Sequence, residues 1–522
     1  MAEETLSDTT MRGLRWVAIT RVVSEVFGVV AAVALARLIT PAAFGHAAVA
    51  LIFLPLAVIL TFEGFASALV QRATIEENDR SSAMLMSLIG GTVLTVLVYV
   101  AAGPVWRPLF GAETASLIQL MSPTMLIGAL GGVSLATLLR ALDFRSTSLI
   151  QVASEAGGSV VAIALAIAGF GARAIIIGAL VQVVISSGLL VVVSRPPLPR
   201  WSWSSQRRIT SFGLPAALVG LVEIIFRNID YAILDARLSA LATGYYYRAF
   251  NLGIEYQRKL SGVMVQVAYP LYARTTDMAR LRSIHERAAR VHAAIVFPLQ
   301  ALLIVTAPVL VPLVFGSAWT PAVRPTQVLA VAGMFATVLA GYAQVMLAIG
   351  LPRQLLYFNS ARLVVFGGAV LLASRHGLVT VAVAVVATYL LILLGAYRLL
   401  LHRYVGISIR RLAPELGPAI VACLVMVAVA LPLMDVLNGN LPRVIQLALV
   451  IVAGLGVYAL VLRVVFPPAW TDARTLVVGV LGPLARRLRR HAPAAGPNDG
   501  ILVPDEGLDA ADRAELSSTE RS

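Results

Sequence analysis

The sequence is poor in cysteine, histidine and charge, and each shortage excludes a class of protein. The single cysteine, Cys423, allows no intramolecular disulfide and no thiolate metal cluster. The six histidines are scattered and no phosphate-cradling glycine loop or nucleophile–base motif stands out, so we expect no cofactor. Only 13% of the 522 residues are charged, 59% are hydrophobic and the mean hydropathy is +0.86. One water-soluble core cannot bury so much apolar surface, which predicts a membrane protein.

Long apolar stretches recur along the chain, with short polar loops between them. A helix needs roughly 20 apolar residues to cross about 30 Å of hydrocarbon. Because alternation of period two is absent, a membrane β-barrel is not expected. We predict an all-α polytopic membrane protein of about 14 transmembrane helices. The predicted spans cover residues 16–38, 44–70, 82–103, 115–139, 149–169, 172–194, 209–235, 245–273, 289–315, 322–350, 355–374, 377–401, 413–435 and 443–466.

Arginine is distributed unevenly between alternate loops. If the N-terminus is cytoplasmic, the loops on that side carry about 20 arginines and the opposite loops about 7. Cytoplasmic loops retain positive charge, so both ends of the chain are predicted to be cytoplasmic. The formal net charge of +14 is therefore attributed to topology and to contact with anionic membrane lipids, and nucleic-acid binding is not expected.

A basic, proline-rich segment at residues 195–208 divides the helices into two halves of six. A short repeat supports this division, because Ala-Arg-Leu at 36–38 precedes Gly45 and Ala-Arg-Leu at 236–238 precedes Gly244. Paired halves are typical of secondary transporters, with the substrate site between them. The predicted organisation is a cytoplasmic N-terminus (1–15), an N-lobe of helices 1–6 (16–200), a C-lobe of helices 7–12 (201–405), helices 13–14 (406–466), an interfacial basic helix (467–492) and a disordered cytoplasmic tail (493–522).

Charged residues cluster within predicted spans, although an isolated charge at the bilayer centre costs about 2.5–3.5 kcal/mol. This cluster predicts a water-filled central cavity whose cations hold an anionic group. The alternative is a set of neutralised pairs, since Arg21/Glu25, Glu223/Arg227 and Glu255/Lys259 each have helical i,i+4 spacing. The clustered residues are Arg21, Glu25, Glu63, Glu155, Glu223, Arg227, Asp230, Arg248, Glu255, Arg258, Lys259 and Arg362.

Several short motifs resemble those of bacterial polysaccharide-biosynthesis flippases of the Wzx type, and the similarity covers roughly residues 12–401. Ser239 stands where that family often has glycine. The family belongs to the multidrug/oligosaccharidyl-lipid/polysaccharide (MOP) exporter superfamily. The resemblance therefore implies two pseudo-symmetric six-helix bundles around a V-shaped central cavity, plus two C-terminal helices. Its motifs are Ala36-Arg37-Leu38-Ile39-Thr40-Pro41 with Phe44-Gly45, Glu63-Gly64-Phe65 with Gln71-Arg72, Leu139-Arg140-Ala141-Leu142-Asp143-Phe144-Arg145, and Arg227-Asn228-Ile229-Asp230 with Gly244-Tyr245-Tyr246.

The resemblance implies a flippase rather than an enzyme. It would move an undecaprenyl-diphosphate-linked oligosaccharide from the cytoplasmic to the outer leaflet of a bacterial inner membrane by alternating access. On this interpretation H⁺ or Na⁺ is a candidate coupling ion, and a polysaccharide polymerase or export machinery is a candidate partner. The diphosphate would be bound by Arg21, Arg227, Arg258, Lys259 and Arg362, and the coupling ion by Glu25, Glu63, Glu223, Asp230 and Glu255.

Two other functions are weighed against this one. A multidrug exporter of the same superfamily favours cationic substrates and an acidic, aromatic cavity, whereas basic residues are here about as numerous as acidic ones within the spans. A membrane glycosyltransferase or polymerase acting on lipid-linked sugars needs carboxylates on a sizeable outer loop. The predicted outer loops are short, with isolated acids such as Glu113 and Asp435.

Overall fold

The computed structural model describes residues 20, 22–58, 69, 75–275, 277–471 and 474. The chain forms two units, Met1–Thr471 and Asp472–Ser522, and the first contains every helix considered below. The cytoplasmic N-terminus predicted at 1–15 and the tail predicted at 493–522 lie outside the described residues. Most of the interfacial helix predicted at 467–492 lies outside them as well, so these predictions remain predictions.

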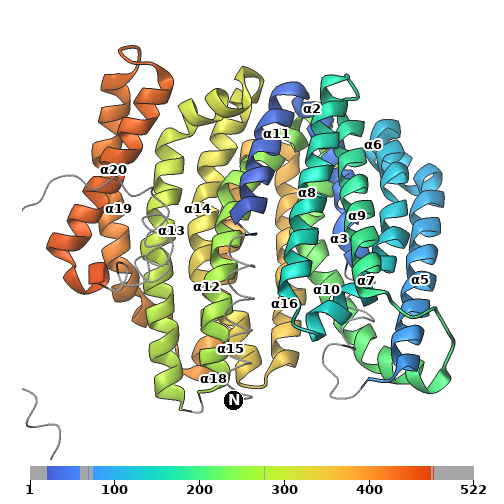
Figure 1. Cartoon of the computed structure of the whole chain (residues 1–522). Coiled ribbons are helices and arrows are strands. Elements are labelled where there is room, and N and C mark those ends of the chain that lie inside the picture. The colour runs from blue at the N-terminus through green and yellow to red at the C-terminus, as the bar shows by residue number, and fades with distance from the viewer. Residues whose placement is uncertain are drawn as a thin grey trace, which may run out of the picture. The chain divides into compact units, whose positions relative to one another are not determined.

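Helices follow one another throughout the described residues, which contain no strand (Figure 1). Residues 22–38 form the first described helix. The rest of the first half comprises α2 (Pro41–Leu51), α3 (Phe53–Val58), α5 (Glu77–Val100), α6 (Arg107–Met121), α7 (Pro123–Arg140), α8 (Phe144–Ile167) and α9 (Ala172–Ser194). The second half comprises α10 (Trp203–Arg237), α11 (Ala240–Phe250), α12 (Tyr256–Ala273), α13 (Met278–Phe315), α14 (Val323–Leu339), α15 (Tyr342–Ala348), α16 (Pro352–Ala373), α17 (Leu378–Gly395) and α18 (His402–Val405). The last two helices are α19 (Ile409–Leu437) and α20 (Arg443–Val465).

Short turns of other helical types continue or join several of these helices. They lie at Ala102–Trp106, Asn251–Glu255, Ser317–Ala322, Ser374–His376 and Ala396–Leu401. The turn at Asn251–Glu255 is π-helical and joins α11 to α12, so a single predicted span is divided into three elements. Such turns change the direction in which successive side chains point.

The prediction of an all-α membrane protein is confirmed. In the described part of the chain, ten helical stretches are long and apolar enough to cross a membrane. Large apolar side chains such as Leu97, Val364 and Val452 are mostly exposed on these helices, as lipid contact requires. The count of fourteen remains a prediction, because the second predicted span, for example, is described continuously only up to residue 58.

Within the first unit, helices of each predicted half pack against one another. In the first half, α7 packs against α5 and α9, and α9 packs against α8. In the second half, α14 packs against α13 and α17, and α16 packs against α10 and α17. The pair α19 and α20 lies beside α13 and contacts it directly (Figure 1).

The internal repeat marks a direct crossing of the two halves, where α2 packs against α11. A Cβ atom built on Gly45 would lie 1.7 Å from the carbonyl oxygen of Ala240, and one built on Gly244 would lie 1.8 Å from that of Pro41. The two backbones therefore touch, and only glycine fits at either position. Residues Thr40 and Ser239 begin the two helices as N-caps, each accepting a hydrogen bond from the backbone N–H three residues later. This capping role accounts for a serine at position 239.

Candidate functional site

The central polar cluster is built from four helical segments of both halves. Residues 22–38 contribute Glu25, and α10 contributes Glu223 and Arg227. The end of the π-helical turn and the start of α12 contribute Glu255, Arg258 and Lys259, and α16 contributes Arg362. Two other predicted site residues, Arg21 and Glu63, lie outside the described residues.

An ion pair between Lys259 and Glu25 connects the two halves. The Nζ atom of Lys259 lies 2.7 Å from a carboxylate oxygen of Glu25, and the two side chains are 49% and 39% exposed. Lys259 was expected to be able to pair with Glu255 on its own helix. Glu255 instead pairs with Arg258, three residues along the chain.

Glu223 is shared by two arginines. One carboxylate oxygen lies 3.3 Å from Nε of Arg227, the i,i+4 partner expected from the sequence, and the other contacts Nη2 of Arg362. Arg362 also lies over the ring of Phe226, with 4.1 Å between its Cζ and the ring centroid. Its side chain is 9% exposed, whereas those of Glu223 and Arg227 are 41% and 45% exposed. Arg362 is therefore the fixed member of this group and Arg227 the accessible one.

The helix breaks between α14 and α15, and this break positions Tyr342 beside the cluster. Sequence reasoning did not identify this residue. Ala340 is extended and Gly341 has φ of +89°, which favours glycine, so the helix ends and restarts at Tyr342. The Tyr342 hydroxyl donates to Oδ1 of Asn359 at 2.8 Å and accepts from Nη1 of Arg362 at 3.1 Å. Broken helices at substrate sites are a recurring feature of transporters. The available signal was a glycine followed by a polar aromatic residue inside an apolar span.

Tyr389 of α17 is a second residue missed by sequence reasoning. Its buried side chain lies close to Arg258 of α12, so α17 also contributes to the cluster. A tyrosine within the apolar span predicted at 377–401 was a weak signal, because such residues commonly pack in cores. With Tyr342, it makes the cluster more hydroxyl-rich than the charged residues alone indicated.

Asp230 lies apart from the exposed ion pairs. Its carboxylate accepts a hydrogen bond from the Tyr246 hydroxyl at 2.8 Å and from the backbone N–H of Tyr231 at 3.0 Å. All three side chains are buried within the core of the second half. The structure thus places Asp230 in a hydrogen-bonded core position, and no ion pair joins it to any of the cluster's described cations.

The described candidate cations outnumber their carboxylate partners. Each of them has a carboxylate neighbour, but two share one partner, so the group retains one excess positive charge. Of the three pairs that the neutralisation alternative named, Glu223/Arg227 forms and Glu255/Lys259 does not. The third includes Arg21, outside the described residues.

On the arginine-poor side of the predicted topology, the end of the first helix is held by the second half. Nε of Arg37 donates to the carbonyl of Val314 at 2.9 Å, and Nε1 of Trp319 donates to the carbonyl of Ala36 at 2.8 Å. Arg248, one of the charged residues that cluster within the predicted spans, is buried and donates to the carbonyl of Ala32 at 2.9 Å. These bonds and the glycine crossing keep the two halves in contact on this side.

Comparison with known proteins agrees with this architecture. Residues 34–324, more than half of the chain, match the family model described as "Polysaccharide biosynthesis protein". The chain is 26% identical over 337 residues to the lipopolysaccharide biosynthesis protein WzxC of Escherichia coli K12, covering 64% of this chain and 68% of that protein.

Solved structures share the fold. The lipid II flippase MurJ, in an inward closed conformation, superposes with a TM-score of 0.69 at 14% identity, over 86% of this chain and 98% of that one. An inward-facing multidrug resistance transporter of the MATE family and MOP superfamily gives a TM-score of 0.57 at 17% identity, over 72% of this chain and 93% of that one. At these identities the two comparisons support the fold alone.

Proposed function

The chain belongs to the polysaccharide biosynthesis protein family within the MOP superfamily of membrane transporters, and on that premise we propose which substrate it moves and how. The proposed substrate is an undecaprenyl-diphosphate-linked oligosaccharide, flipped from the cytoplasmic to the outer leaflet by alternating access. The proposed location is a bacterial inner membrane with both chain ends in the cytoplasm. A polymerase or export machinery would then receive the glycan on the outer side.

The lipid tail of such a substrate can remain in the bilayer, but its diphosphate cannot cross hydrocarbon unaided. Moving an isolated ion into a medium of low dielectric constant costs tens of kcal/mol. Guanidinium groups form paired, charge-assisted hydrogen bonds with phosphate oxygens and so replace the lost hydration. We assign this role to Arg227, Arg258, Lys259 and Arg362, and on sequence grounds to Arg21.

The observation that carries the proposal is that Arg227 and Lys259 are held by accessible carboxylates, those of Glu223 and Glu25. Exposed ion pairs contribute only about 0–1 kcal/mol each. A diphosphate, with more oxygens and more charge than one carboxylate, can therefore displace Glu223 from Arg227 and Glu25 from Lys259. The alternative of permanently neutralised pairs requires the same contacts to persist when substrate is present.

Displacement also provides a route to ion coupling. Once the phosphates occupy the cations, the released carboxylates of Glu25, Glu223 and Glu255 can accept H⁺ or Na⁺. Lys259 is the only lysine among 41 basic residues, and an ammonium, unlike a guanidinium, can itself release a proton. The membrane potential is a further drive, since two negative charges moved outward gain roughly 4.6 kcal/mol per 100 mV.

The contacts between the halves fit alternating access. The Lys259–Glu25 pair lies among the proposed binding residues, so substrate binding would remove one of the links between the first helix and α12. The bonds of Arg37, Arg248 and Trp319 must then break for the site to open on the arginine-poor side. Substrate binding and opening are thus linked through the first helix.

The proposal is tested by reconstituting the full chain in proteoliposomes and measuring how fast a labelled undecaprenyl-diphosphate-linked sugar becomes accessible to an impermeant reagent. A hydrogen bond to a charged group contributes about 1.5–3 kcal/mol. Arg258→Ala is therefore expected to slow flipping roughly tenfold or more. Arg353→Ala, an exposed arginine of α16 that bonds only Tyr357 among described residues, is the matched control. Equal rates for both variants would contradict the proposal.

A further inference from the structure

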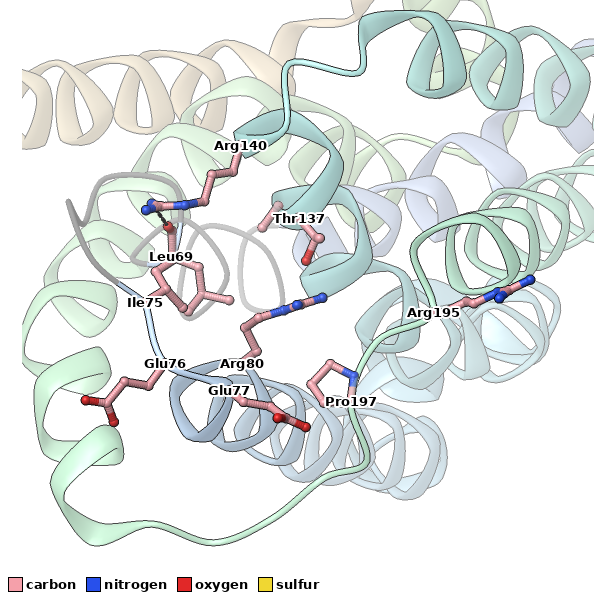
Figure 2. Close-up of a pocket in the computed structure, with 10 residues that line it drawn as sticks. Leu69, Ile75, Glu76, Glu77, Arg80, Thr137, Arg140, Arg195 and Pro197 are labelled. Carbon is pink, nitrogen blue, oxygen red and sulfur yellow. Dashed lines mark hydrogen bonds between the residues drawn. The ribbon is translucent and has the colours of Figure 1, made fainter.

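A cationic cavity lies in the first half, away from the central cluster. It has a volume of about 420 Å³, within the range of about 300–1,000 Å³ that is usual for small-molecule sites. Its walls come from the start of α5, the end of α7 and the segment that follows α9 (Figure 2). These ends lie on the arginine-rich side, which the positive-inside rule assigns to the cytoplasm.

Three arginines line this cavity, each from a different element. Arg80 lies in the first turn of α5, and its Nε atom is buried without a hydrogen-bond partner among the described residues. Arg140 ends α7 and donates from Nη1 to the carbonyl of Leu69 at 3.0 Å. Arg195 caps α9 at the rim, with its guanidinium directed outward (Figure 2).

The backbone at Arg195 is strained. It has φ of +45° and ψ of 66°, the left-handed region that glycine adopts freely and other residues enter at a cost. This conformation ends α9 and turns the chain so that Pro197 closes one side of the cavity (Figure 2). The strained backbone of Arg195 lies at the rim of the cationic cavity, which indicates that the shape of the cavity depends on this conformation.

The acidic residues at the cavity do not neutralise Arg80. Glu76 and Glu77 lie at the start of α5, and both carboxylates point away from the cavity centre (Figure 2). Among the described residues, no ion pair joins either of them to Arg80 or Arg195. The buried Asp79 accepts the backbone N–H of Glu76 as part of the helix cap.

We infer that this cavity binds a phosphate group, and that its source is an anionic phospholipid of the inner leaflet. Guanidinium groups favour a phosphate ligand, because they form charge-assisted hydrogen bonds with phosphate oxygens. Thr137 and the apolar residues Leu69, Ile75, Ala136 and Pro197 form the remaining walls, and the apolar part suits the glycerol and upper acyl carbons of a lipid. Free phosphate shares the recognised chemistry but would leave these walls without a partner. The inference is independent of the flipping proposal.

Occupation of the cavity would act on the segment that joins the two halves. The backbone N–H of Arg200 donates to the carbonyl of Ser81 at 3.4 Å, and the Ser82 hydroxyl donates to the carbonyl of Arg200 at 3.3 Å. These two hydrogen bonds hold the segment between α9 and α10 against α5, beside the cavity. A bound phosphate would lie between these two hydrogen bonds and the end of α7.

The inference is tested by native mass spectrometry of the detergent-purified full chain, titrated with phosphatidylglycerol or with phosphatidylcholine of the same acyl chains. A hydrogen bond to a charged group contributes about 1.5–3 kcal/mol, so Arg80→Gln should weaken phosphatidylglycerol binding about tenfold or more. Arg195→Gly should weaken it as well while relieving backbone strain, so its melting temperature should be unchanged or higher. Arg403→Gln, an exposed arginine of α18 on the same side, is the control for lost charge and should have little effect.

Millimolar inorganic phosphate distinguishes the two sources. Competition with phosphatidylglycerol in the unmodified chain but not in Arg80→Gln would support a phosphate site used by lipid. Equal binding of the two lipids, with phosphate alone protecting the chain against unfolding, would overturn the lipid assignment. Equal weakening by Arg403→Gln and Arg80→Gln would overturn the cavity itself, since binding would then follow overall charge.

Discussion

Substitution of Gly45 by alanine should disrupt the contact between the two halves. The new Cβ atom would lie 1.7 Å from the carbonyl oxygen of Ala240 and 2.6 Å from its carbon. Both neighbours are backbone atoms, so no flexible side chain can move aside, and the helices α2 and α11 must separate. Overpacking of this kind costs about 1–3 kcal/mol. If the cost falls on the closed state alone, the population ratio of closed to open molecules falls about 5- to 150-fold.

The assay is a distance measurement between spin labels on the arginine-poor side. Labels at Ala112 in α6 and Ala318 in the turn before α14, both exposed, report on separate halves, and Cys423→Ser removes the native thiol. Gly45→Ala is expected to shift the distance distribution to longer values. Gly188→Ala in α9 is the control, because a Cβ atom there meets nothing within 4 Å. An identical distribution in both variants, with both proteins folded, would refute the role assigned to the crossing.

Three further predictions concern the central cluster. Lys259→Arg keeps the positive charge beside Glu25 but removes a group that is able to release a proton. Flipping in vesicles should therefore persist and lose part of its dependence on a pH gradient. An unchanged dependence on the pH gradient would count against coupling through Lys259. Tyr342→Phe removes the hydroxyl that orients Arg362, and loss of about 1 kcal/mol should raise the half-saturating substrate concentration roughly fivefold without changing the melting temperature. Glu223→Gln leaves Arg227 and Arg362 without their shared carboxylate, so undecaprenyl diphosphate should bind more tightly in equilibrium titrations, and weaker binding would contradict the displacement step.

Much of the fold could be predicted from the sequence because the bilayer imposes a simple rule on composition. Long apolar stretches predicted helical segments, and the repeat around Gly45 and Gly244 indicated two halves. The contact between the two repeated positions was not predicted, because a repeat does not report which residues meet in space. Hydropathy did not predict the breaks inside spans. The interruption at Ala340 and Gly341 and the π-helical turn at Asn251–Glu255 depend on local backbone geometry, which leaves the average hydropathy almost unchanged.

The charged residues of the candidate site could be predicted from the sequence better than the ion pairs that they form. Helical spacing correctly indicated Glu223/Arg227, since both residues lie on one face of α10. The same rule gave the wrong partner for Lys259, whose contact is Glu25, 234 positions earlier in the chain. No local pattern reports a contact between helices of different halves. Asp230 likewise looked similar to the other acids, although core packing around Tyr246 gives it a different environment.

The central claim is that the clustered cations recognise a diphosphate. Its most direct test compares the dissociation constants of undecaprenyl diphosphate and undecaprenyl monophosphate for the purified full chain and for Arg227→Ala and Arg258→Ala. The account predicts that the unmodified protein prefers the diphosphate by about tenfold or more and that each substitution removes most of this preference. Equal affinity for the two lipids, or a preference that survives both substitutions, would contradict it.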